Sequence, residues 1–150
     1  MNQYRTDEEL INICENFIAA SMEYDKIGRP NDPPWKDTIP IMCNILYEFG
    51  NRIRQNNQIS EYILNLYLNT GECLAYELIH LNDWSRVESI YHHMACMYKD
   101  YTTEIDEERL IYYQKQEREA QLNKHEQQSL GCFGCLGIII VIGILYKILF

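Results

Sequence analysis

Residues 41–53, with the sequence IMCNILYEFGNRI, indicate most clearly how this 150-residue chain folds. Apolar side chains recur here at positions i, i+4, i+7 and i+11, a spacing that lines them up along one face of an α-helix. This stripe consists of Met42, Leu46, Phe49 and Ile53. Gly50 follows the third of them, and its lack of a side chain would let a neighbouring helix approach closely. The pattern predicts an amphipathic helix that begins near Thr38, with Pro40 in its first turn, and fades at 55–57.

A first helix is predicted upstream of this stretch. Thr6 and Glu9 form a capping box, in which each residue satisfies a backbone N–H group of the other at the start of a helix. Gly28 and Pro30 are residues that end helices, and a proline-rich loop follows them.

The helical pattern continues downstream. Two short helices are predicted at 60–68 and 72–81, separated by the break Asn69-Thr70-Gly71. Asp83 is a good N-cap for a further helix over 84–101. Since the alternation typical of strands occurs nowhere, the sequence predicts an all-α fold.

The segment 130–150 is an almost unbroken apolar run in which Lys147 is the one charged residue. About twenty such residues cross the hydrocarbon core of a bilayer, and a lysine close to the end can reach the interface. We expect a transmembrane tail anchor, with the preceding residues in the cytosol, at the mitochondrial outer membrane or the endoplasmic reticulum. A buried core helix is the alternative.

A charged segment, 103–129, leads into this tail. Its apolar stripe is thin, so it is either a half-docked helix or a solvated spacer. The chain is thus predicted to comprise a helical bundle domain at 1–102, a juxtamembrane segment at 103–129 and a tail anchor at 130–150.

Composition narrows the classes of function. With 22 acidic and 13 basic residues the net charge is −9, which disfavours a surface for nucleic acids or anionic lipids. The six cysteines are expected to be reduced thiols, and Cys132 and Cys135, at the membrane entrance, could carry acyl groups or remain unmodified. His92 and Cys96 have the spacing of metal ligands but no evident further ligand. We therefore expect no metal, no cofactor and no catalysis.

A second motif, Asn82-Asp83-Trp84-Ser85-Arg86-Val87, can be compared with known families together with the stripe at 41–53. It resembles the first homology motif of the B-cell lymphoma 2 (Bcl) family of apoptosis regulators, an Asn-Trp-Gly-Arg turn that opens a helix, with Asp83 and Ser85 as departures. The stripe resembles that family's third homology motif, with Gly50 as its small residue and Asn51 where the family has Asp. A first helix, a proline-rich loop and a tail anchor follow the same order as in the family.

The resemblance implies a Bcl-like helical bundle that binds proteins. A hydrophobic groove would accept the amphipathic death-motif helix of a pro-apoptotic relative, with Arg86 as the ionic anchor, and would most simply inhibit cell death by sequestration. Promotion of cell death stays open, because the stripe could itself be the ligand. The expected groove residues are Leu64, Leu74, Leu78, Asp83, Trp84, Arg86, Val87 and Ile90, although each apolar one could equally be core.

The resemblance fails after residue 101. The family normally has an apolar sixth helix and a later tryptophan-containing motif, whereas this chain has the charged segment and no tryptophan after Trp84. The chain therefore resembles a shortened or divergent member. The alternative function is a tail-anchored helical scaffold or adaptor at an intracellular membrane. Gly131, Gly134 and Gly137 in the tail could let two copies pack as a homodimer.

Overall fold

The computed structural model describes residues 5–29, 35–56, 59–102 and 106–149, with side chains as far as Ser129. Its regular elements are all helical, so the prediction of an all-α fold is confirmed for the described part of the chain. The elements are α1 (Asp7–Lys26), the short 3-10 helix η1 (Lys36–Thr38), α2 (Ile39–Gln55), α3 (Glu61–His80), α4 (Trp84–Tyr101) and α5 (Glu107–Leu149).

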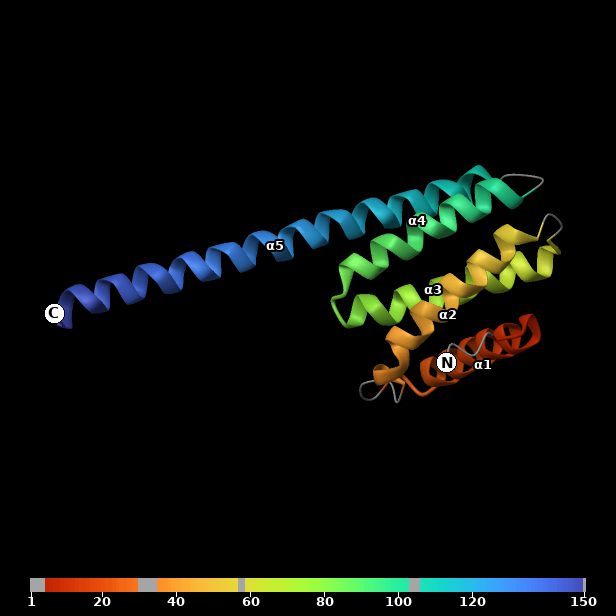
Figure 1. The fold of residues 1–150 in the computed structure, drawn as a ribbon, viewed down its shortest axis with the longest axis horizontal. Coiled ribbons are helices and arrows are strands. Elements are labelled where there is room, and N and C mark those ends of the chain that lie inside the picture. Colours follow the sequence, from red (N-terminus) through yellow and green to blue (C-terminus); the bar gives the residue numbers. More distant parts are fainter. Residues whose placement is uncertain (1–4, 30–34, 57–58, 103–105, 150) are drawn as a thin grey trace.

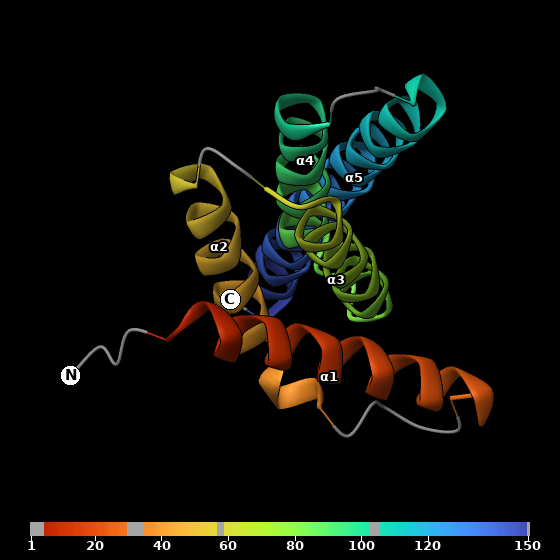
Figure 2. The ribbon, with the colours of Figure 1, turned by 90° about the vertical axis from the view of Figure 1, so that its right-hand side faces the viewer.

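Helix α3 lies at the centre of the five-helix bundle. It contacts α1, α2 and α4, whereas α5 packs against α4 and then continues beyond the other helices (Figure 1). Figure 2 shows α1 lying across one side of the bundle. Because α3 has neighbours on several sides, its apolar residues are not confined to one stripe. Its buried residues are Leu64, Leu66, Tyr67, Leu68, Thr70, Gly71, Leu74, Ala75, Glu77 and Leu78.

The start of α1 follows the predicted capping box. The backbone N–H of Glu9 donates to Thr6 Oγ1 over 3.2 Å, and the Thr6 N–H donates to Glu9 Oε2 over 2.7 Å. The helix ends before Gly28, which has a positive φ of 75°, a conformation that glycine adopts without strain.

The end of α1 is tied to α3 by an ion pair. Arg29 Nη1 lies 2.8 Å from Oε1 of Glu77, a carboxylate that is completely buried on α3. Ser21 donates to the same oxygen over 3.3 Å, and the Arg29 guanidinium stacks 4.5 Å from the Tyr76 ring centroid. A buried carboxylate is tolerable only with such partners, so these contacts fix how α1 crosses α3.

The stripe on α2 is buried as the sequence predicts. Met42, Leu46, Phe49 and Ile53 all belong to the core. A Cβ added at Gly50 would lie 3.1 Å from the Tyr67 ring, so the missing side chain permits the close approach of α2 to α3. The helix has a proline in its first turn and ends at Gln55.

The predicted break between two short helices is wrong, because α3 runs without interruption through residues 69–71. Thr70 is fully buried and donates its hydroxyl proton to the Leu66 carbonyl oxygen over 2.7 Å, so it bonds within the helix. Gly71 lies where Met94 of α4 contacts α3: an added Cβ would be 2.5 Å from Met94 Sδ. This glycine allows close helix packing and does not end a helix.

Helix α4 begins as predicted. The Asp83 carboxylate accepts from the backbone N–H of Arg86 over 3.2 Å, which is the hydrogen bond of an N-cap. The inward face of α4 includes Val87, Ile90, Met94 and Met97, each of which is buried in the core.

The charged segment before the tail forms the first part of α5 and is docked on the bundle. Tyr113 and Ala120, seven residues apart on one helix face, are fully buried. The Tyr113 hydroxyl donates to Glu72 Oε1 over 2.9 Å, and Lys124 Nζ lies 2.7 Å from Glu88 Oε2. A solvated spacer would make none of these contacts, so residues 107–124 pack with the helices that precede them.

The expected tail anchor falls on residues 130–150, which lie outside those whose side chains are described. The α5 backbone continues through them as far as Leu149. In the part of the chain for which side chains are given, no helix combines the length and the apolar character needed to cross a bilayer.

Candidate functional site

The apolar residues expected to line a groove lie in the closed core. Their side chains are at most 5% exposed, and all of them belong to one cluster. These residues are Leu64, Leu74, Leu78, Val87 and Ile90. The structure therefore brings them together, but as core packing between α3 and α4. Leu64 also lines a separate pocket of about 460 Å³ between α3, α4 and α5.

Arg86, the expected ionic anchor, lies on the exposed first turn of α4. Its Nη1 is 2.8 Å from Asp83 Oδ2, and 47% of its side chain is accessible. Asp83 and Trp84 line a shallow hollow of about 390 Å³ together with α5, and Gln127 of α5 donates to the Asn82 carbonyl over 3.1 Å. This hollow is open and polar, and the apolar candidates do not line it.

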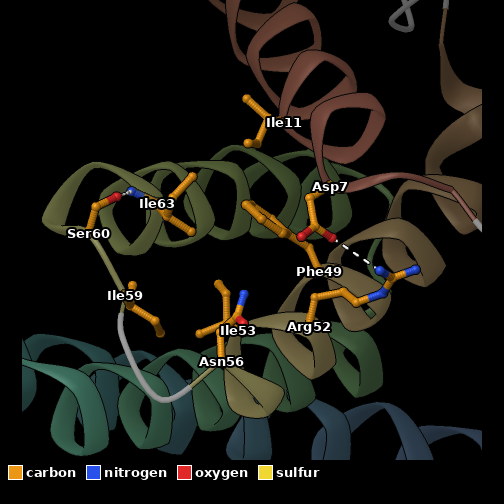
Figure 3. A pocket seen from close by; sticks show the side chains of 9 residues that line it. All are labelled: Asp7, Ile11, Phe49, Arg52, Ile53, Asn56, Ile59, Ser60 and Ile63. Atoms are coloured by element: carbon orange, nitrogen blue, oxygen red, sulfur yellow. Dashed lines mark hydrogen bonds and ion pairs between the residues drawn. The ribbon is translucent and has the colours of Figure 1, made fainter.

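An apolar pocket occurs elsewhere, at the junction of α1, α2 and α3 (Figure 3). Its volume is about 290 Å³. Phe49 and Ile53, the last two residues of the α2 stripe, are almost fully buried and form its floor. The full set of lining residues is Asp7, Ile11, Phe49, Arg52, Ile53, Asn56, Ile59, Ser60 and Ile63.

The walls of the apolar pocket come from two distant parts of the sequence, the start of α1 and the start of α3. Ile11 of α1, Ile59 before α3 and Ile63 of α3 are each half-buried. Ser60 is the N-cap of α3, and its hydroxyl oxygen accepts from the Ile63 backbone N–H over 3.3 Å, which fixes the turn that carries both isoleucines. These residues were not predicted, because no local pattern relates the start of α1 to the start of α3.

A guanidinium group lies at the rim of the apolar pocket. Arg52 Nη1 is 3.1 Å from Asp7 Oδ1, and Nη2 donates to the Arg5 carbonyl oxygen over 2.9 Å. The Asp7 side chain is largely exposed, so this ion pair contributes little to stability and an incoming carboxylate could replace it. The pocket can thus accept an apolar side chain that has an acidic group beside it.

Three of the four cysteines in the described part of the chain are thiols whose pKa is raised by burial. Burial raises the pKa of Cys14 to about 11, and burial also raises the pKa values of Cys43 and Cys73. Such thiols stay protonated at neutral pH and are poor nucleophiles and metal ligands. Cys132 and Cys135, the expected acylation sites, lie outside the residues whose side chains are described.

The pair with metal-ligand spacing on α4 has other contacts. His92 Nε2 is 3.8 Å from Cys96 Sγ, and His92 Nδ1 is 3.0 Å from Glu117 Oε1 of α5. Over the described residues, no group of three histidine, cysteine or acidic side chains could hold a metal ion. His92 and Glu117 instead join α4 to α5.

Comparison of the chain with family models, curated proteins and solved structures finds no match.

Proposed function

We propose that this chain is a membrane-tethered regulator of cell death that binds amphipathic death-motif helices, as the resemblance to the Bcl family implies. The observation that carries the proposal is the apolar pocket with Arg52 at its rim. Its floor is the end of the same α2 stripe that resembles the third homology motif. An amphipathic helix presents the matching chemistry, a large apolar side chain with an acidic residue one turn away.

The pocket sets the expected strength of binding. Burial of one large aliphatic or aromatic side chain contributes roughly 1.5–3 kcal/mol. A hydrogen bond between Arg52 and a carboxylate adds roughly 1.5–3 kcal/mol. Since micromolar affinity requires about 8 kcal/mol, contacts along the rest of the helix must supply the remainder. We therefore expect a Kd on the order of 10 μM, weaker than a long preformed groove would give.

The tail completes the proposal. Residues 130–150 would anchor the chain in the mitochondrial outer membrane or the endoplasmic reticulum, and the bundle would then meet partner helices at the membrane surface. Sequestration of a pro-apoptotic relative there would inhibit cell death. The partner is recognised by its amphipathic helix, with no cofactor and no catalytic step.

A calorimetric titration tests the proposal. The full-length chain in neutral detergent micelles is titrated with a panel of amphipathic death-motif helices, each paired with a version whose acidic residue is replaced by alanine. We expect saturable binding of at least one helix and roughly tenfold weaker binding of its alanine version. The absence of binding to every helix by a folded chain would contradict the proposal.

The alternative, a helical scaffold or adaptor, has its own supporting observation. The face of α5 that points away from α4 carries Ile111 and Leu122, which are 60% and 61% exposed. They lie eleven residues apart on one side of the helix, where a partner helix could pack. If the titration fails, Ile111→Lys and Leu122→Lys would identify adaptor function through loss of partner proteins recovered with the wild-type chain.

A further inference from the structure

A second pocket lies on the opposite face of α2 from the apolar pocket, between α2, α3 and α4. Its volume is about 230 Å³. Four of its residues, at positions i, i+3, i+4 and i+7, form one face of α2. The lining residues are Tyr47, Gly50, Asn51, Arg54, Tyr67 and His93. We call it the α2–α4 pocket.

Tyr67 forms the inner wall of this pocket and is 1% exposed. Its hydroxyl has no hydrogen-bond partner among the described residues, and Gly50 lies directly against it: a Cβ there would be 3.3 Å from the hydroxyl oxygen. The hydroxyl oxygen is not one of the fully enclosed polar atoms, so it is open to the pocket, and phenylalanine would fill the same space without loss of a bond within the described structure. Burial raises the pKa of Tyr67, so its hydroxyl keeps its proton and can act as a donor.

Arg54 supplies a positive charge at the mouth of the pocket. No described carboxylate lies within ion-pair distance of its guanidinium, whereas Arg29, Arg52, Arg86 and Arg109 all have such partners. No aspartate or glutamate lines the pocket. At physiological ionic strength charges more than about 8 Å away are largely screened, so the local charge outweighs the net charge of −9 of the whole chain.

The other walls are polar as well. Asn51 contributes a side-chain amide beside Arg54. His93 Nδ1 is 2.7 Å from the Ser89 carbonyl oxygen, and the Tyr47 hydroxyl is 2.7 Å from Ser89 Oγ. These bonds to one residue of α4 hold the imidazole and the Tyr47 ring in place, so the walls of the pocket are fixed before any ligand enters.

We propose that the α2–α4 pocket binds a single oxyanion group, a phosphate or a carboxylate carried by a small molecule. The Arg54 guanidinium and the Asn51 amide donate to its oxygens at the mouth, and the Tyr67 hydroxyl donates from the inner wall. This donor set matches an oxyanion, which has several lone pairs and needs an adjacent positive charge. The site is independent of helix binding at the apolar pocket.

Calorimetry on the full-length chain in maltoside micelles, which carry no phosphate, tests this site. Inorganic phosphate and acetate are titrated separately at constant ionic strength. We expect saturable binding of at least one of them with a Kd of order 1 mM. The anion that gives saturable binding shows whether the pocket prefers a phosphate or a carboxylate. If neither anion gives saturable heat, the proposal is overturned.

Three variants assign the binding to the pocket. Arg54→Gln should raise the Kd roughly tenfold, and Tyr67→Phe roughly threefold to tenfold. Tyr67→Phe should also leave the melting temperature unchanged or higher, since its hydroxyl makes no bond within the described structure, whereas a purely structural tyrosine would lower it. Arg118→Gln removes an exposed arginine on α5 and is the matched control. Equal weakening by Arg118→Gln and Arg54→Gln would show that the anion binds to the general surface and would overturn the site.

Discussion

Replacement of Gly71 by alanine should destabilise the fold, although alanine is the better helix former. In the interior of a helix alanine is favoured over glycine by about 1 kcal/mol. Here, however, the added Cβ would lie 2.5 Å from Sδ and 3.1 Å from Cγ of Met94, a side chain with no exposed surface. Overpacking of this kind costs about 1–3 kcal/mol. The net expectation is a loss of about 1 kcal/mol in the free energy of unfolding.

A double-mutant cycle separates the two effects. Met94→Ala alone should cost about 2–5 kcal/mol through the cavity that it leaves. In that background Gly71→Ala should become stabilising by about 1 kcal/mol, which gives a coupling energy of about 2 kcal/mol. Asn69→Ala, at an exposed position two residues away in α3, is the control and should stabilise slightly.

Chemical denaturation of the full-length chain, followed by far-UV circular dichroism, measures each value. If Gly71→Ala stabilised the wild-type chain by about 1 kcal/mol, Met94 would have room to move aside. The close α3–α4 packing inferred from Gly71 would then be refuted.

Three further predictions concern the site and the docking of α5. Arg52→Gln should weaken binding of a death-motif helix by about 1–3 kcal/mol, whereas Arg86→Gln should leave the calorimetric Kd unchanged; the reverse result would place the ligand at the start of α4. Asp83→Ala should lower the free energy of unfolding by about 1 kcal/mol through loss of the α4 N-cap, and an Asp83→Asn variant that lost as much would refute the capping role. The hydrogen bond from Lys124 lowers the pKa of Glu88. This bond therefore stabilises the fold fully at pH values above the ordinary glutamate pKa, and the stabilisation is lost as the pH falls through the lowered pKa of Glu88. Denaturation across this pH range should show that the free energy of unfolding falls less in Lys124→Met than in the wild-type chain. An identical pH dependence in the two proteins would exclude the Lys124–Glu88 pair as the source of the loss.

Local signals in the sequence were enough to predict several elements of the fold. The capping box at Thr6, the stripe on α2 and the N-cap Asp83 each depend on residues within a few turns of one another, and each occurs in the structure as expected. The break at 69–71 was mispredicted because tertiary packing decides it. Gly71 is explained by Met94 of another helix, which no local rule includes.

The site was harder to predict for a related reason. Apolar spacing correctly identified Leu74 and Val87 as members of buried helix faces, but the same spacing suits a closed core and the floor of an open groove. The apolar pocket combines residues from the starts of α1 and α3 with the end of α2, and only the folded arrangement brings Ile11 and Ile63 together. The docking of α5 likewise depends on Tyr113 and Ala120, two buried residues in a segment that is otherwise highly charged and therefore shows only a weak apolar pattern.

The central claim is that an amphipathic helix binds at the apolar pocket, and isoleucine methyl NMR of the full-length chain in micelles tests it most directly. On addition of a death-motif helix, we predict that the methyl signals of Ile11, Ile59 and Ile63 shift with saturation. Ile90, which is buried between α3 and α4, should remain unchanged. Saturable shifts confined to Ile90 and its neighbours, or no shift at any isoleucine, would contradict this assignment.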